Sequence, residues 1–131
     1  MAILEQLPAF IGSMGLAESQ ARESVAAVER HPEMVGRAAD AGLRVLAGTD
    51  AGMVPHGIIG REVQHLVAAG LPADLALAGA SWEARRYLGL AGIEEGAEAD
   101  IVVFDSDPRD DVAVIGRPSL RILDGRVAEA A

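Results

Sequence analysis

An aspartate and a histidine, Asp50 and His56, lie close together in the glycine-rich stretch LAGTDAGMVPHG at residues 46–57. A carboxylate in such a stretch has two common uses. It can bond the backbone of a turn, or it can hold a metal ion and accept a proton from water. An aspartate among glycines more often serves the turn, so these residues by themselves leave both uses open.

The stretch continues a short apolar run, LRVLAG at residues 43–48, which we expect to be a buried strand because glycines bound it. Helical patterns surround this run. We expect helices at residues 2–13, 17–30 and 31–42 before it, and at 58–70, 72–80 and 82–89 after it. Pro32 suits the first turn of the third helix, and Gly42 suits its end.

A single buried strand cannot form a sheet by itself. A parallel strand needs neighbours on both edges and cover on both faces, and a complete (β/α)8 barrel takes about 250 residues. Because the chain has 131 residues, the sequence predicts a piece of a larger α/β structure.

The last third of the chain has a different pattern. ADIVVFD at residues 99–105 is typical of a strand, and residues 119–130 predict two short strands joined at Asp124 and Gly125. An Asp-Gly pair is a strong signal for a two-residue hairpin turn. We therefore expect a boundary near residues 90–98, with neither part folding independently.

The composition argues against several classes of function. The chain carries 20 acidic residues against 11 basic ones, a formal net charge of −9, which would repel nucleic-acid phosphates and anionic membranes. It has no cysteine, so disulfides and thiolate metal sites are excluded. We recognise neither a signal peptide nor a membrane helix, and we expect a cytoplasmic protein that binds neither nucleic acid nor membrane.

An ordered set of motifs runs through nearly the whole chain: VERHPEMVGRAADAGLRVLAGTDAG, PHG at 55–57, Glu62, LPADLALAGAS, ARRYLGL, GAEADIVVFDSDP and ILDGRV. In this order the motifs resemble the C-terminal part of the metal-dependent amidohydrolase superfamily, especially its imidazolonepropionase-like and prolidase-like branch. The resemblance implies an α/β fold in which residues 1–90 are the C-terminal piece of a TIM (β/α)8 barrel, with its last strand and flanking helices. Residues 91–131 would be C-terminal strands of a small β-sandwich.

The same resemblance implies roles for the two loop residues. Asp50 matches the aspartate that ends the eighth barrel strand, where it is a catalytic residue and a metal ligand. His56 would contact the substrate, and hydrogen bonding to the loop backbone is the alternative. The implied reaction is hydrolysis of a C–N bond, in an amide or cyclic amide, by metal-activated water. Zinc is the expected metal, and a small amide-type molecule is the expected substrate.

The family's other metal ligands have no counterpart in this chain. They include a His-x-His pair, a lysine or glutamate and further histidines, whereas the chain has three histidines, no His-x-His and no lysine. A zinc site typically needs three or four ligands, so we expect the isolated chain to be incomplete. The alternative is a noncatalytic fragment or subunit that associates with copies of itself or with the missing barrel portion.

Other polar residues are given structural roles. We expect His31 to cap a helix start or lie on the surface, and His65 to lie on a solvated helix face. Glu62 would either orient the loop or be an ordinary exposed helix acid.

A cluster of acids follows the strand expected at residues 99–105, namely Asp105, Asp107, Asp110 and Asp111. Their spacing lacks the glycine and the terminal glutamate of a calcium-binding loop. We therefore expect a solvated turn.

Overall fold

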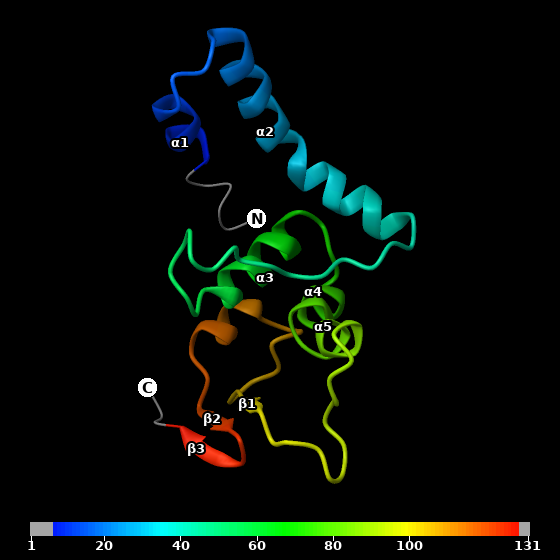
Figure 1. The fold of residues 1–131 in the computed structure, drawn as a ribbon. Coiled ribbons are helices and arrows are strands. Elements are labelled where there is room, and N and C mark those ends of the chain that lie inside the picture. The colour runs from blue at the N-terminus through cyan, green and yellow to red at the C-terminus, as the bar shows by residue number, and fades with distance from the viewer. Residues whose placement is uncertain (1–6, 129–131) are drawn as a thin grey trace.

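The computed structural model describes residues 7–128, in which helices come first and a small antiparallel sheet comes last (Figure 1). The elements are α1 (Leu7–Ser13), α2 (Glu18–Asp40), α3 (Ile59–Ala68), α4 (Ala73–Ala80), α5 (Trp82–Tyr87), β1 (Ile101–Val103), the 3-10 helix η2 (Val112–Gly116), β2 (Leu120–Leu123) and β3 (Arg126–Ala128). In Figure 1, α1 and α2 lie at the top, α3 to α5 in the middle and the sheet at the bottom. The expected mixture of helices and strands is confirmed. No helix in this part of the chain is both long and apolar enough to cross a membrane.

A single long helix, α2, replaces the two helices expected at residues 17–30 and 31–42. Pro32 lies inside it rather than at a first turn, although an interior proline costs a helix about 3 kcal/mol. Helix-favouring alanines and glutamates on both sides of Pro32, and the packing of Val35 and Ala39 against the core, offset this cost. The predicted end is confirmed, because Gly42 has φ 75° and its N–H bonds the carbonyl of Ala39 at 2.8 Å.

The strand expected at residues 43–48 does not form, since this segment pairs with no strand among residues 7–128. It lies instead against α4, where the N–H of Ala47 donates to the carbonyl of Gly79 at 3.0 Å. The approach is so close that a Cβ at Gly79 would stand 2.5 Å from the carbonyl oxygen of Val45. Hydrogen bonds to a neighbour define a strand, and the described residues offer this segment no neighbouring strand.

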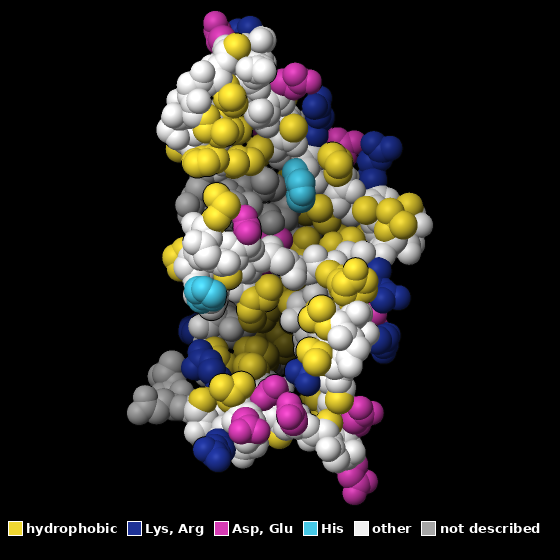
Figure 2. Space-filling model, viewed as in Figure 1, with side chains coloured by type: hydrophobic (Ala, Val, Ile, Leu, Met, Phe, Trp, Pro, Cys, Tyr) yellow, Lys and Arg dark blue, Asp and Glu magenta, His cyan; other side chains and the backbone are white. Residues whose placement is uncertain are grey.

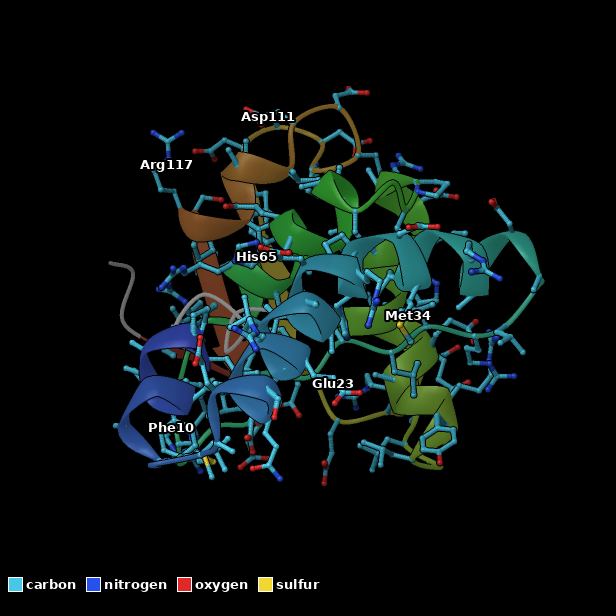
Figure 3. The ribbon with its side chains drawn as sticks, turned by 90° about the horizontal axis from the view of Figure 1, so that it is seen from above. Phe10, Glu23, Met34, His65, Asp111 and Arg117 are labelled. Carbon is cyan, nitrogen blue, oxygen red and sulfur yellow. The ribbon has the colours of Figure 1, made fainter. Side chains whose placement is uncertain are left out.

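The core lies between α3 and α4. Its buried side chains are those of Val63, Leu66, Leu71 and Ala76. Partly buried side chains pack against them. Besides those of α3 and α4 themselves, they come from α2, from the segment 43–48 and from η2, and include Val35, Ala39, Val45, Ala47 and Ile115. Seen from above, α2 passes over α3 (Figure 3). Helices and segment therefore share one core, which holds the segment in place beneath α2.

The sheet has the order β1-β2-β3, and both pairs are antiparallel. β2 and β3 form the expected hairpin around Asp124 and Gly125, whose φ angles of 50° and 70° suit a two-residue type I′ turn. β1 pairs Ile101 with Ile122 and is shorter than the strand expected at 99–105. The last residues of the expected final strand lie outside the described residues.

Two contacts attach the sheet to the helices. The carboxylate of Asp100 accepts the N–H of Asp124 at 2.9 Å and lies 3.8 Å from the guanidinium of Arg85 on α5. At another point η2 packs on α3, where a Cβ at Gly60 would stand 3.1 Å from Cγ2 of Ile115. The hairpin turn and the 3-10 helix are thus both held by the helical part of the chain.

Candidate active site

The loop that follows residues 43–48 turns sharply at Asp50. This residue has φ 53°, a left-handed conformation that aspartate adopts more readily than most residues. Its carbonyl accepts the N–H groups of Met53 at 3.1 Å and Val54 at 3.4 Å, and the N–H of Gly52 donates to the carbonyl of Val54 at 3.2 Å. The side chain of Val54 is 6% exposed, so backbone bonds and one buried anchor set the position of Asp50.

The carboxylate of Asp50 takes no part in this turn. It is exposed, and it makes no hydrogen bond or ion pair within residues 7–128. Asp100, Asp107 and Asp111 behave differently, because each of their carboxylates accepts a backbone N–H at 2.9 Å. The carbonyl of Asp50 alone therefore serves the turn, and its carboxylate has no structural partner in the described chain.

His56 lies near the end of the same loop and is also exposed. It precedes Gly57, whose φ of 85° leads the chain towards α3. Both residues singled out in the sequence thus belong to one exposed loop. No group of three or more histidines, aspartates and glutamates in residues 7–128 is placed to hold a metal ion, so this part of the chain does not by itself fit a complete metal site.

Two polar residues of α3 are more buried than expected. Glu62 is 3% exposed, so its interpretation as an exposed helix acid is wrong, and His65 is half-buried rather than solvated. The spacing indicates why: Glu62 lies four residues before Leu66, on the helix face that Leu66 buries. A role for Glu62 in orienting the loop stays a prediction.

His31 is not at a helix start. It lies inside α2 and is half-buried, because that helix continues through Pro32. The capping role expected for His31 is wrong for this reason.

The acids that follow β1 form a turn, as expected. The carboxylate of Asp107 accepts the backbone N–H of Arg109 at 2.9 Å and pairs with its guanidinium, and Asp111 caps η2 by accepting the N–H of Ala113. The hydrogen bond from the Arg109 side chain, with a smaller contribution from its backbone N–H, lowers the pKa of Asp107 from 3.8 to about 2. These carboxylates serve the local backbone, unlike that of Asp50.

Known proteins resemble the chain over nearly its full length. The family model described as amidohydrolase family matches residues 9–128. The uncharacterized proteins Rv2915c of Mycobacterium tuberculosis and Mb2939c of Mycobacterium bovis are each 39% identical over 124 residues, covering 94% of this chain and 34% of the relative. The chain therefore spans about a third of the length of these curated relatives.

Two solved structures share its fold. The crystal structure of a Xaa-Pro dipeptidase with methionine bound in its active site is 25% identical, with a TM-score of 0.78, and the match covers 97% of this chain and 33% of that one. A prolidase candidate from Bifidobacterium longum is 34% identical, with a TM-score of 0.74, over 89% of this chain and 30% of that one. With a family match from residue 9 to residue 128, the chain belongs to the amidohydrolase family.

Proposed function

We propose that this chain contributes the Asp50 loop to a metal-dependent hydrolase that cleaves a C–N bond in a small amide or cyclic amide. The observation that carries the proposal is the Asp50 carboxylate, which is exposed after residues 43–48 and has no bond within the described residues. Members of the amidohydrolase family generally use divalent metals, and carboxylate oxygens are common ligands of such ions.

The chemistry needs a positioned carboxylate, and this chain supplies one. A divalent cation, with zinc as the expected ion, would supply a nucleophilic water at neutral pH if it were bound beside Asp50. Because the N–H groups of Met53 and Val54 hold the Asp50 carbonyl, the backbone that carries this carboxylate is fixed in place. The carboxylate can accept a proton and return it to the leaving nitrogen. His56, exposed on the same loop, would contact the substrate.

The remaining ligands would come from elsewhere. Residues 7–128 contain no group of three metal-ligating side chains, whereas a zinc site typically has three or four. We call the two-thirds of the curated relatives that this chain does not span the complementary portion. The proposed enzyme is the assembly of this chain with that portion.

The solved relatives suggest the first substrates to test. One of them is a Xaa-Pro dipeptidase, so we propose Xaa-Pro dipeptides as the first class of compound and lactams as its cyclic counterpart. Both classes present a carbonyl next to a C–N bond, the group that a proton-accepting carboxylate can help to cleave.

A second candidate function is that of a noncatalytic piece that associates with copies of itself or with a partner. The number of ligands favours it, because the described residues provide the single loop carboxylate and no metal-binding cluster. The two candidates differ in what they predict for the assembled protein: metal and hydrolysis in the first, neither in the second.

Zinc content and dipeptide hydrolysis, measured on the chain alone and together with the complementary portion, test the proposal. Asp50→Asn removes the charge and keeps a residue that tolerates the left-handed conformation. Asp124→Asn is the matched control, since Asp124 has φ 50° in the hairpin. We expect near-stoichiometric zinc in the assembly, with hydrolysis reduced by at least about 100-fold in Asp50→Asn and unchanged in Asp124→Asn.

Other results would contradict the proposal. Zinc and hydrolysis that survive Asp50→Asn would show that the loop carboxylate is not a ligand. An assembled protein without metal and without hydrolysis would favour the noncatalytic candidate.

A further inference from the structure

His56 owes its position to the residues on either side of it. It makes no hydrogen bond of its own within the described residues. The chain enters this stretch at Val54, which is buried, and leaves it at Ile58, the residue that precedes α3. Pro55, His56 and Gly57 connect these two points. The place of His56 therefore depends on where both points are held.

The second point, Ile58, is bonded to the first turn of α3. Its carbonyl accepts the N–H of Arg61 at 2.9 Å and that of Glu62 at 3.4 Å. The side chains of Glu62 and Val63 are buried, at 3% and 1% exposed, so this turn is packed into the molecule. Whatever positions the first turn of α3 also positions the end of the loop.

The first turn of α3 packs on η2 at Gly60. A Cβ at Gly60 would stand 3.1 Å from Cγ2 and 3.8 Å from the carbonyl carbon of Ile115, so the side chain and the backbone of Ile115 both approach the turn closely. Figure 3 shows η2, between Asp111 and Arg117, beside α3. Figure 2 shows hydrophobic side chains deep between the middle helices and the sheet at the bottom. The junction of these two parts is therefore apolar.

η2 itself is held by the C-terminal part of the chain. At its start, the Asp111 carboxylate accepts the N–H of Ala113 at 2.9 Å. Beyond its end, the N–H and the hydroxyl of Ser119 donate to the carbonyl of Val103 in β1, at 2.9 Å and 3.2 Å. Ile115 thus lies on a short element that is fixed on both sides.

We propose that Ile115 is a positioning residue for substrate binding, which sets the place of His56 through Gly60 and the first turn of α3. The inference rests on the proposed function for the role of His56, whereas the positioning itself concerns this chain alone. Asp50 is not positioned in this way, because backbone bonds within the loop hold its carbonyl. The C-terminal part of the chain therefore serves the substrate side of the loop.

Amide exchange of the 131-residue chain, followed by NMR, tests the positioning without an assay of activity. Ile115→Ala removes the side chain that packs on α3. We expect the two amides bonded to the Ile58 carbonyl to exchange at least about fivefold faster, and the two amides bonded to the Asp50 carbonyl to be unchanged. The control is Ile93→Ala, the same truncation at a side chain that is 90% exposed, which should change neither pair.

The amide of Leu71, bonded to the carbonyl of Leu66 in the core, reports the stability of the whole chain. Exchange that accelerates more at the amides bonded to Ile58 than at Leu71 supports the inference. Equal acceleration at Leu71 would show a merely structural role for Ile115. Unchanged exchange at the amides bonded to Ile58, or equal acceleration at those bonded to Asp50, would likewise overturn the inference.

Combining Gly60→Ala with Ile115→Ala tests the contact itself. In the native chain the added methyl group crowds Ile115, whereas in Ile115→Ala the crowding atom Cγ2 is gone. We therefore expect Gly60→Ala to lower the folding equilibrium constant at least about threefold less in the Ile115→Ala background, as measured by urea denaturation. Equal effects in both backgrounds would show that the two positions do not interact, and would overturn the inference.

In the assembly with the complementary portion, the inference predicts which kinetic constant changes. We expect Ile115→Ala to raise KM for a Xaa-Pro dipeptide at least about threefold with kcat little changed, because a displaced His56 binds the substrate less well. Asp50→Asn should lower kcat instead. A loss confined to kcat in Ile115→Ala would overturn the inference. An assembly that hydrolyses nothing would contradict the proposed function, and the exchange experiment would still decide whether Ile115 positions the loop.

Discussion

Asp50, with φ 53°, and Asp124, with φ 50°, have nearly the same backbone φ angle. The chain segments next to them differ in whether they pair with a strand. The hairpin around Asp124 closes its hydrogen bonds within the chain, and the Asp124 N–H is bound by the Asp100 carboxylate. The segment before Asp50 has no paired strand among residues 7–128. Local signals therefore suffice where all partners are near in sequence, as in the hairpin, whereas the apolar pattern of residues 43–48 alone does not make a strand within the described chain.

The largest effect is expected from Gly79→Ala, which tests whether α4 fixes the unpaired segment. A Cβ at Gly79 would stand 2.5 Å from the Val45 carbonyl oxygen, so segment or helix must move. We expect a loss of about 2–3 kcal/mol in the free energy of unfolding, measured by urea denaturation.

Gly12→Ala is the control for this substitution. Gly12 also lies in a helix, and nothing lies within 4 Å of a Cβ placed there. Alanine stabilises an open helical position by about 0.5–1 kcal/mol relative to glycine. If Gly79→Ala were as harmless as Gly12→Ala, the segment would not be held by α4.

A smaller effect is expected from Gly125→Ala in the hairpin. Gly125 has φ 70° and open space around it, so an added Cβ brings conformational strain of about 1–2 kcal/mol and no collision. Asp124→Asn is the control and should be close to neutral, because asparagine suits the left-handed region. A loss for Asp124→Asn as large as for Gly125→Ala would contradict the turn assignment.

The sequence predicts correctly those elements whose interacting residues are neighbours in the chain. The hairpin turn at Asp124 and Gly125 and the helix end at Gly42 depend on residues that lie next to each other, and both are as predicted. The strand at residues 43–48 depends on neighbours that the described chain does not contain, and it is absent. α2 runs through Pro32 because contacts with the core outweigh the local cost of a proline.

For the candidate site, the sequence predicts where the loop lies. It does not predict that the Asp50 carbonyl makes the turn while the carboxylate has no bond in the described residues. The turn involves Val54, a buried residue whose N–H donates to the Asp50 carbonyl from four residues away. The burial of Glu62 is different, because its spacing from Leu66 on α3 already indicates it.

The smallest effect concerns pH, and it sharpens the contrast between a bonded acid and the unbonded Asp50. The folded pKa of Asp107 is lowered from 3.8 to about 2 by its hydrogen bonds to Arg109. The stabilisation is therefore complete above the unfolded pKa and is lost as the pH falls through about 2. Because the pair is exposed, the effect is small and weakens with salt.

We expect Asp107→Asn to be less stable than the native chain near pH 5, with the difference vanishing towards pH 2 in urea titrations. Asp105→Asn removes a neighbouring exposed acid that has no hydrogen bond in the described residues; a similar pH-dependent loss there would assign the effect to net charge instead of the Asp107–Arg109 pair.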